Sequence, residues 1–495
     1  MKGKRIIAAA LVCAAFAGAM AGCAGGEKTA DDKVKLKYVM PGPGTQEDSS
    51  RVWAEWNKKL QEKLPNVEVE FEVVPASEYK QNVALMLSAK EQIDILNTYG
   101  LDFINEVNNG TFAPLDDLLK KYGQETLGTL PGWFMDYQKK DGVTYGIPSY
   151  QICGSIPAIY FIKEYADKYL DIDGFTKAFQ NNSTEMETAY GYLDDMLTKA
   201  KADGVTFKTT QCFWDKGMED ITSWFAIPIN PDEEVKVMYG LLTEDKKKEY
   251  RMRREWYKKG FIREDELSQT DNENYIGKKD GLPWWTTTYS PGYDKTLSEK
   301  YGVEIMAIPY YKGYYIPYKN SAAGTSIVES SKHKEEAMQV INLLQTDKEL
   351  YNLLVYGIEG EHYKKIGEDR IETPTGAQST SSDKYGLWGW IVGNIENAYD
   401  LQTTQEGFKE WVFDEVNQST WRSKLLGFNL DTSNISTELA QIEAIAEEYK
   451  DPLKSGSIED CEGYMAEWES KFEVAGGNKV REEIQKQLDE FLASK

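Results

Sequence analysis

Near the start of this chain, strand and helix patterns alternate in an order that constrains the fold more than any other feature. Apolar and charged side chains alternate with a period of two over 33–40 and 67–73, and a short, mostly apolar run follows at 93–96, which predicts three strands. Apolar residues recur at helical spacing over 49–64 and 77–87, between those strands. Because a strand–helix–strand–helix–strand order favours a parallel sheet with right-handed crossovers, we expect an α/β fold.

The carboxyl ends of these strands are the expected ligand site, since open α/β sheets bind their ligands there. Segment 42–48 follows the first strand, and segment 97–102 follows the third. The candidate ligand-binding residues in these segments carry hydroxyl, amide or aromatic groups: Thr45, Gln46, Asn97 and Tyr99. The spacing places each of them at a strand end and does not by itself bring them together.

The length of the chain, 495 residues, indicates two or three domains, because single cores seldom grow so large. Two later strands are expected at 281–289 and 303–309. Further helices are expected at 185–202, 245–259, 332–356, 439–449 and 480–491.

Residues 1–22 have the three parts of a secretory signal, namely a basic start, an uncharged apolar run and small residues at the end. The apolar run is too short and too rich in alanine to span about 30 Å of hydrocarbon. Met20-Ala21-Gly22-Cys23 resembles a bacterial lipobox, whose cysteine receives a diacylglyceryl group before cleavage. We therefore expect Cys23 to be lipidated and 23–33 to be a flexible tether, which holds the protein to the extracytoplasmic face of the cell membrane.

The net charge excludes one class of partner. Lysine and arginine total 57 against 81 aspartates and glutamates, a formal charge of −24. Removal of the expected signal takes away Lys2, Lys4 and Arg5 and leaves 54 cations against 81 anions, a charge of −27. Such a surface repels phosphate backbones, so we expect no nucleic-acid partner.

Few residues suit a metal or redox site. Only two histidines occur, His333 and His362, which argues against a histidine-rich metal site. Segment 171–174 imitates the middle of an EF-hand loop, but Tyr169 and Gln180 stand where acidic ligands belong. Three cysteines follow Cys23 in the chain: Cys153, Cys212 and Cys461. Their number is small and odd, so we expect no disulfide framework and expect these residues to be buried. We expect neither a metal nor a cofactor.

Four segments, in a fixed order, carry a resemblance to a known family. Gly110–Leu119 is similar to a "G-x-x-x-P-L-D-D-L-L" motif, and Tyr145–Pro148 resembles a crossing between two lobes. Ser331–Ala337 is similar to an "S-K-x-K-E-x-A" helix start. Tyr356–Tyr363 resembles the LipO-like lipoproteins, which have an extra C-terminal region of unassigned function. The chain thus resembles an extracellular solute-binding protein of an ABC importer, family 1, the maltose-binding-like group.

This resemblance implies a type II periplasmic-binding-protein-like fold with two lobes, each a mainly parallel sheet flanked by helices, and a helical C-terminal extension. The first lobe would take 34–147 and 305–357, and the second 148–304 and 358–495. Two or three crossing segments would join the lobes, and a ligand would be held in the cleft between them. The resemblance also implies an oligosaccharide ligand, ABC permease partners and, as we expect, a monomer.

Aromatic residues make up 12% of the chain, which suits a sugar site. Flat aromatic faces pack against the C–H faces of sugar rings, while fixed amides bind the hydroxyls. The candidates outside the first strand ends are Tyr150, Gln151, Trp284, Trp285, Trp388, Trp390 and Asn394. Packing in a core or between lobes is the alternative for the tryptophans, and hinge packing is favoured for most tyrosines of 310–318.

Catalysis finds little support, and we expect no enzyme. The chain has no G-x-S-x-G, H-E-x-x-H, P-loop or G-x-G-x-x-G motif. The two carboxylates of a glycosidase have no fixed spacing, so 81 acidic residues do not decide against one. Together with the signal and the lipobox-like segment, the resemblance predicts a lipid-anchored protein that captures an oligosaccharide by cleft closure and delivers it to a permease. A binder of peptides or other solutes and a secreted glycan-active enzyme are the alternatives.

Overall fold

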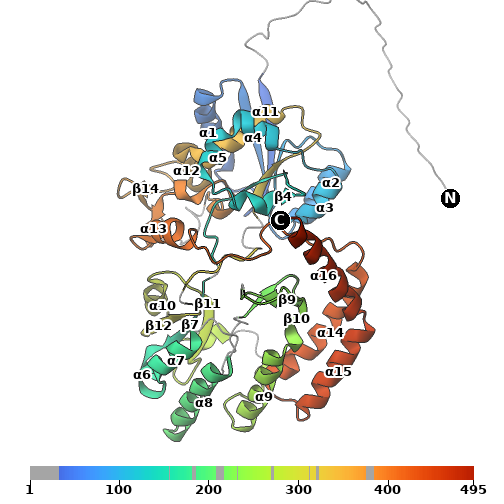
Figure 1. Cartoon of the computed structure of the whole chain (residues 1–495). Helices are drawn as coiled ribbons and strands as arrows, with labels where there is room; N and C mark the ends of the chain where they lie inside the picture. The colour runs from blue at the N-terminus through green and yellow to red at the C-terminus, as the bar shows by residue number, and fades with distance from the viewer. Residues whose placement is uncertain are drawn as a thin grey trace, which may run out of the picture.

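The computed structural model describes residues 33–495, apart from short gaps at 155, 181–185, 208–216, 231, 269–271, 312, 319–322 and 375–383. Two lobes lie one above the other and are joined by thin crossing segments (Figure 1). The expected signal, Cys23 and the tether up to residue 32 lie outside the described residues, as does Cys212.

The sheet of the first lobe has the strand order β2-β1-β3-β13-β6. β1 (Val34–Gly42) lies parallel to both β2 (Val67–Pro75) and β3 (Ile95–Asn97). β13 (Gly324–Ile327) runs antiparallel between β3 and β6 (Ile147–Pro148). The βαβαβ prediction is therefore confirmed, and a strand from much later in the chain completes the sheet.

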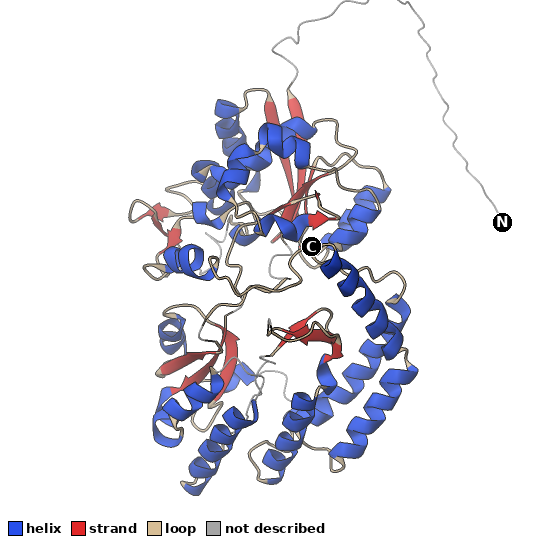
Figure 2. Cartoon of the chain, viewed as in Figure 1, coloured by secondary structure: helices blue, strands red, loops and turns tan. Residues whose placement is uncertain are grey.

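Helices flank this sheet (Figure 2). They are α1 (Ser49–Lys63), α2 (Tyr79–Ser88), α3 (Phe103–Asn108), α4 (Asp116–Tyr122), α5 (Gln124–Thr129), α11 (Lys334–Thr346) and α12 (Lys348–Tyr356). The 3-10 turn η1 (Phe134–Gln138) and the hairpin of β4 (Lys139–Lys140) and β5 (Val143–Thr144) lie beside them.

The single helix expected over 332–356 is two helices, because Asp347 has an extended backbone and ends the first of them. Its side chain then accepts a hydrogen bond from the Leu350 backbone N–H at 2.9 Å, which caps the second helix.

The segment after α12 packs with the first lobe, not with the second as the sequence-based division had it. Tyr363, Tyr385 and Leu387 share one hydrophobic core with Tyr38 and Trp56. The segment contains β14 (Lys364–Lys365), β15 (Arg370–Glu372), η5 (Gly389–Ile391), η6 (Ile395–Asn397), β16 (Asp400–Leu401), α13 (Phe408–Glu410) and the π-helical turn η7 (Trp411–Val416).

The second lobe has two small sheets, and both differ from the mainly parallel sheet that was expected. β7 (Pro157–Ile162) runs antiparallel to β11 (Trp284–Thr288) on one side and to β12 (Ile305–Pro309) on the other. β11 and β12 run in the same direction and are connected through α10 (Tyr293–Tyr301). β7 lies between them in the sheet and runs in the opposite direction. The other sheet is an antiparallel meander of β8 (Met218–Asp220), β9 (Phe225–Pro228) and β10 (Met238–Tyr239). The remaining elements are α6 (Lys163–Tyr169), α7 (Ile172–Phe179), α8 (Met186–Ala202), η2 (Gly240–Leu242), α9 (Glu244–Lys258), η3 (Glu266–Ser268) and η4 (Asn272–Tyr275).

Three helices end the chain: α14 (Ser436–Ser455), α15 (Cys461–Val474) and α16 (Gly477–Ala493), named here the C-terminal helical unit. Phe225 and Tyr239 of the second lobe share a hydrophobic core with Trp468 of α15 and with α14 and α16. The unit extends along one side of the molecule, so that the end of the chain lies beside the first lobe (Figure 1). It is therefore fixed to the second lobe and reaches toward the first. Among the described residues, no helix combines the length and apolar character needed to cross a membrane.

Hydrogen bonds tie the crossing segments to one another. Ile316 accepts from the Ser423 backbone N–H at 2.8 Å and donates to the Trp421 carbonyl at 3.0 Å, so two of the crossings pair side by side. The buried Glu219 carboxylate accepts hydrogen bonds from Tyr315 Oη at 2.8 Å and Ser423 Oγ at 2.5 Å. The crossing segments are therefore hydrogen-bonded to one another, and we call them together the bonded strap.

Candidate ligand-binding site

The carboxyl ends of the parallel strands face the second lobe. β1 begins at the end of the first lobe that lies away from the second lobe and runs toward the crossing segments (Figure 1). The loops that follow β1 and β3 therefore lie at the edge of the first lobe nearest the second. This is the edge at which α/β sheets bind ligands.

Three aromatic side chains meet at this edge. The Tyr99 ring, two residues after β3, meets the Trp390 ring edge to face at a centroid distance of 4.8 Å. Trp390 in turn stacks on Trp388 at 5.9 Å, with only 11° between the ring planes. All three side chains are half-buried, so each keeps part of its surface open to solvent. We call this group the aromatic shelf, and its flat apolar rings suit the C–H face of a ring compound.

Hydrogen bonds from the first strands hold the loop that carries the shelf. Gln46 Nε2 donates to the Gly386 carbonyl at 2.9 Å, and Asn97 Nδ2 donates to the Ile391 carbonyl at 2.9 Å. Asn97 is fully buried, and its Oδ1 accepts from the Tyr99 backbone N–H at 3.0 Å. Gln46 and Asn97 were predicted to bind ligand, and in the structure their amides position the shelf. Thr45 is exposed at the same edge.

A buried histidine supports the same region. His362 Nδ1 accepts from the Ile358 backbone N–H at 2.9 Å, so its proton is on Nε2, which donates to Asp48 Oδ2 at 3.1 Å. The Arg51 guanidinium, and after it His362, lowers the pKa of the Asp48 carboxyl. Sequence reasoning did not find this pair, although the motif around Tyr356–Tyr363 pointed to the segment.

Two predicted residues near the first crossing are buried and structural. The Tyr150 ring lies between Phe134 and Phe413, each at 5.1 Å, and burial raises the pKa of Tyr150 to about 12. Asn394 is 1% exposed, and its Oδ1 accepts from the Glu396 backbone N–H at 2.9 Å.

Gln151 is half-buried, and its backbone carbonyl accepts a hydrogen bond from Asn417 Nδ2 at 2.9 Å. Asn417 also accepts from the Cys153 backbone N–H at 2.8 Å, which joins the first crossing to the last. The structure brings none of Tyr150, Gln151 and Asn394 onto the shelf.

Trp284 and Trp285 lie in the core of the second lobe. Their side chains point to opposite faces of β11, as strand alternation predicts, but helices cover both faces. Trp284 is 0% exposed and meets Trp256 at 6.2 Å, whereas Trp285 is 6% exposed and stacks on Tyr160 at 5.8 Å. Neither offers a face to a ligand in this structure. The crossing tyrosines Tyr310, Tyr315 and Tyr318 are also buried, in line with the hinge-packing alternative.

The acidic residues of the described ranges form no cluster of metal ligands. Within the described ranges, no group of three or more histidine, cysteine or acidic residues is placed to hold a metal ion. Asp171, from the segment that imitates an EF-hand, instead caps α7 by accepting from the Gly174 backbone N–H at 3.0 Å. The buried Glu219 is committed to the crossing segments.

Two protein families match the chain. The family described as "Bacterial extracellular solute-binding protein" matches residues 42–350. A "Domain of unknown function (DUF3502)" matches residues 424–493, which include the C-terminal helical unit.

Similar proteins cover nearly the whole chain. A carbohydrate ABC transporter substrate-binding protein of Streptococcus pneumoniae serotype 4 (strain ATCC BAA-334 / TIGR4) is 25% identical over 481 residues, which are 95% of this chain and 94% of that protein. The crystal structure of an N-glycan transport solute binding protein from Streptococcus pneumoniae has a TM-score of 0.74 at 24% identity, covering 93% of this chain and 99% of the other.

Further structures have the same fold. The Streptococcus pneumoniae protein in complex with Man5GlcNAc has a TM-score of 0.61 at 23% identity, covering 94% of this chain and 99% of the other. An extracellular solute-binding protein from Bifidobacterium longum subsp. infantis has a TM-score of 0.60 at 16% identity, again covering 94% and 99%. The two-lobed α/β fold expected from the sequence is therefore confirmed.

Proposed function

This chain belongs to the bacterial extracellular solute-binding protein family, and from that premise we propose that it captures an oligosaccharide for an ABC importer. Members of this family bind solutes outside the cytoplasm and are not enzymes, so the expectation of a non-catalytic protein is confirmed. The carbohydrate-binding relative and the glycan complex of a similar protein support a sugar as the solute.

The aromatic shelf is the observation that carries this proposal. Tyr99, Trp388 and Trp390 lie at the strand ends that face the second lobe, and they are half-buried where the other candidate tryptophans are enclosed. Aromatic rings hold sugars through their C–H faces, because these faces are apolar while the hydroxyls around the ring edge stay available for hydrogen bonds. We infer that a sugar ring packs on the shelf, near the exposed Thr45.

Capture would proceed by closure of the two lobes. A ligand on the first lobe stabilises the closed form only if it gains contacts with the second lobe that exist in that form alone.

We propose further that the protein is a monomeric lipoprotein of the LipO-like subgroup, anchored through Cys23. The lipobox-like sequence before Cys23 and the motif at Tyr356–Tyr363 support this assignment. A diacylglyceryl anchor on the extracytoplasmic face would keep the closed, loaded protein near its permease.

Thermal shift measurements across a saccharide panel test the function. Purified protein would be heated with manno-, gluco-, xylo- and galacto-oligosaccharides, with Man1GlcNAc and Man5GlcNAc, and with short peptides. We expect at least one saccharide to raise the melting temperature and to be recovered chemically unchanged, since a ligand that binds only the folded state stabilises it. A rise with peptides and with no saccharide would show that the solute is not a sugar, and release of a product would show an enzyme.

A further inference from the structure

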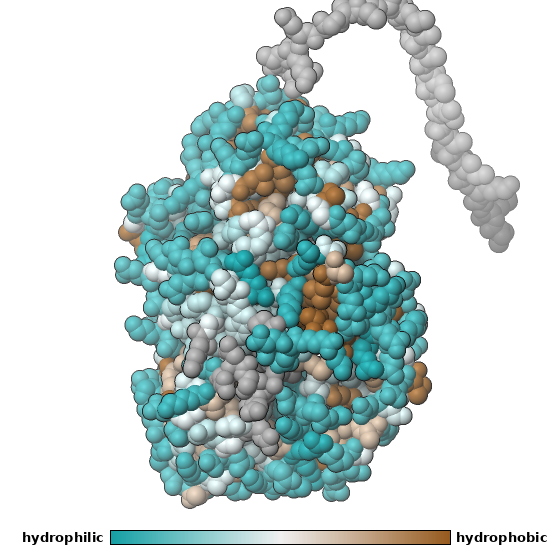
Figure 3. All heavy atoms as spheres, in the orientation of Figure 1, coloured by the Kyte–Doolittle hydropathy of each residue, from teal (hydrophilic) through white to brown (hydrophobic). Residues whose placement is uncertain are grey.

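A cavity lies near the aromatic shelf, and residues from three parts of the chain line it. The first lobe contributes 100–104 with Tyr137, the second lobe contributes 221–224, and the end of the chain contributes 427–443. The cavity has a volume of about 750 Å³, within the range of about 300–1,000 Å³ that suits small-molecule sites. Figure 3 shows hydrophobic side chains gathered near the middle of this face, beside the C-terminal helices. We call this cavity the distal groove.

The distal groove and the shelf adjoin along the chain. Tyr99 is part of the shelf, and the next residue, Gly100, lines the groove. Gly100 has a φ of 79°, a left-handed conformation that lets the chain turn there at little cost. A ligand that extends from the shelf past Tyr99 toward Gly100 would reach the groove.

Trp224 gives the groove a flat apolar wall. It is half-buried in the turn between β8 and β9, and Thr222 Oγ1 fixes this turn by accepting from the backbone N–H groups of Trp224 at 3.2 Å and Phe225 at 3.0 Å. The indole packs against the core that the second lobe shares with the C-terminal helical unit, and Lys450 Nζ lies 5.5 Å from its centroid. These contacts support the turn and one part of the indole, and the rest of the half-buried ring lines the groove.

The lining also includes apolar side chains such as Leu101 and Leu439, and its polar groups carry little net charge. Ser223, Thr432 and Ser436 bring hydroxyl groups, and the charged groups are Lys80, Asp102 and Glu443. One cation and two anions do not make a site for phosphate or for an acidic sugar. Hydroxyls around an aromatic face match an uncharged, polyhydroxylated ring instead.

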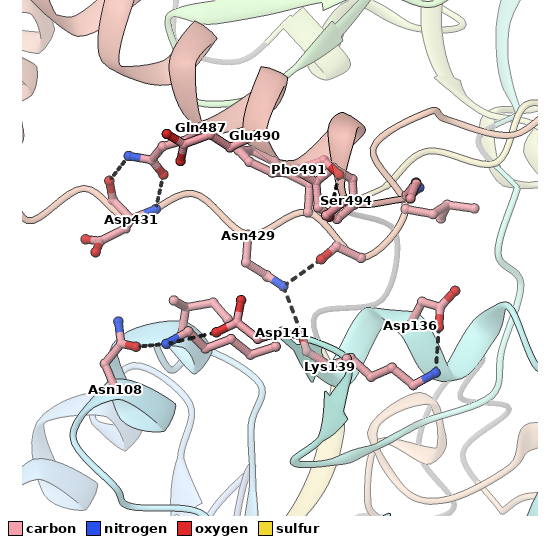
Figure 4. Close-up of a pocket in the computed structure, with 17 residues that line it drawn as sticks. Asn108, Asp136, Lys139, Asp141, Asn429, Asp431, Gln487, Glu490, Phe491 and Ser494 are labelled. Carbon is pink, nitrogen blue, oxygen red and sulfur yellow. Dashed lines mark hydrogen bonds and ion pairs between the residues drawn. The ribbon is translucent and has the colours of Figure 1, made fainter.

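The C-terminal part of the chain forms one wall of the groove, and hydrogen bonds beside that wall hold it in place. Gln487 of α16 donates to the Asp431 carbonyl at 2.9 Å and accepts from the Asp431 backbone N–H at 2.9 Å (Figure 4). Asn429 Nδ2 lies 3.3 Å from the Lys139 carbonyl of the first lobe (Figure 4). These bonds fix the segment around 427–431, which lies between the distal groove and a neighbouring cavity. That second cavity lies under α16 and has a volume of about 790 Å³. That cavity contains cations and anions already engaged with one another, such as Lys139 with Asp136 at 2.8 Å, and carries no proposal.

We propose that the distal groove binds a second arm of a long or branched neutral oligosaccharide whose first arm lies on the aromatic shelf. The C-terminal helical unit is then the third wall of the ligand site, next to the two lobes. This inference rests on the proposed function and adds a role for the 424–493 domain.

Calorimetric titrations with Man1GlcNAc and Man5GlcNAc test this role. Ala440 and Ser436 are exposed on α14 and line the groove, so Ala440→Trp and Ser436→Trp fill it without touching a core. We expect wild type to bind Man5GlcNAc more tightly than Man1GlcNAc. Each filling variant should weaken Man5GlcNAc binding about tenfold and leave Man1GlcNAc binding unchanged, because only the longer glycan reaches Trp224.

Matched variants separate the possible failures. Ala466 is exposed on α15 away from the groove, so Ala466→Trp controls for an added indole and should bind both glycans as wild type does. Unaltered Man5GlcNAc binding in both filling variants, with melting temperatures like that of wild type, overturns the groove inference and leaves the proposed function standing. If wild type binds no saccharide at all, the proposed function itself fails.

Discussion

Replacement of Trp390 by alanine is the most direct test of the aromatic shelf. Trp390 contacts Trp388 at 5.9 Å and Tyr99 at 4.8 Å, and aromatic pairs contribute about 0.5–1.5 kcal/mol each beyond their buried area. The two contacts together predict a loss of about 1–3 kcal/mol in the free energy of unfolding. The fold should persist, because the backbone around Trp390 is held by Tyr351 Oη, which donates to the Gly389 carbonyl at 2.8 Å, and by Asn97.

Trp390→Ala should also weaken ligand binding. The loss should be a larger fraction of the binding free energy than the loss of stability is of the free energy of unfolding. A central aromatic residue of a binding site costs about 2 kcal/mol or more when it is truncated to alanine. At about 1.4 kcal/mol for each factor of ten, the dissociation constant should rise about 30-fold. Isothermal titration with the saccharide that gives the greatest thermal shift measures this value, and urea unfolding measures the loss of stability.

Two variants complete the experiment. Trp390→Phe keeps an aromatic face and should recover most of the affinity. Tyr301→Ala removes a half-buried ring of the second lobe, 6.3 Å from Trp285 and away from the shelf, so affinity should not change. If Trp390→Ala binds the saccharide as tightly as wild type, the shelf is not the binding site and the reasoning is refuted.

Three other predictions concern the framework around the site. The pKa of Asp48 is held below its ordinary value of 3.8 by Arg51 and then by His362, so its stabilising contribution is present at neutral pH and is lost as the pH falls below about 4. The difference in melting temperature between wild type and Asp48→Asn should therefore shrink from pH 7 to pH 3, and a constant difference would contradict this origin. Asp347→Ala removes the cap of α12 and should lower the free energy of unfolding by about 1 kcal/mol in urea, whereas Asp347→Ser should recover most of it. In Glu219→Gln one carboxylate oxygen becomes an NH2 donor, whereas Tyr315 Oη and Ser423 Oγ donate to one oxygen and the Tyr318 backbone N–H donates to the other, so urea unfolding should show a loss of about 1–3 kcal/mol. The exposed Glu443→Gln is its control, and equal stabilities of the two variants would argue against the bonded strap.

Local patterns in the sequence predicted the first lobe well. The βαβαβ order over 33–96 is local, and the rule that ligands lie beyond parallel strand ends pointed to Tyr99, which lies at the edge facing the second lobe. Trp388 and Trp390 were both candidates from the sequence, and in the structure their rings stack on each other. Helix α15 was missed, although Cys461, Met465, Trp468 and Phe472 have helical spacing.

Contacts between distant segments could not be predicted in the same way. Asn97 was assigned to the ligand because a polar residue at a strand end can bind either a solute or the backbone of another loop, and only the fold shows the Ile391 carbonyl 2.9 Å away. Trp284 and Trp285 alternate across β11 as predicted, yet helices from both sides bury them. The return of Tyr363 and Tyr385 to the first lobe likewise depends on packing with residues more than 300 positions earlier, such as Tyr38.

The bonded strap of crossing segments has a consequence for how capture can be observed. Because Glu219 joins two crossings and Asn417 joins the first crossing to the last, the lobes are expected to rotate about one axis and not to swivel independently. Opening would then be described by a single angular coordinate. One pair of fluorescent labels, with one dye on each lobe, would follow the whole trajectory of a single molecule.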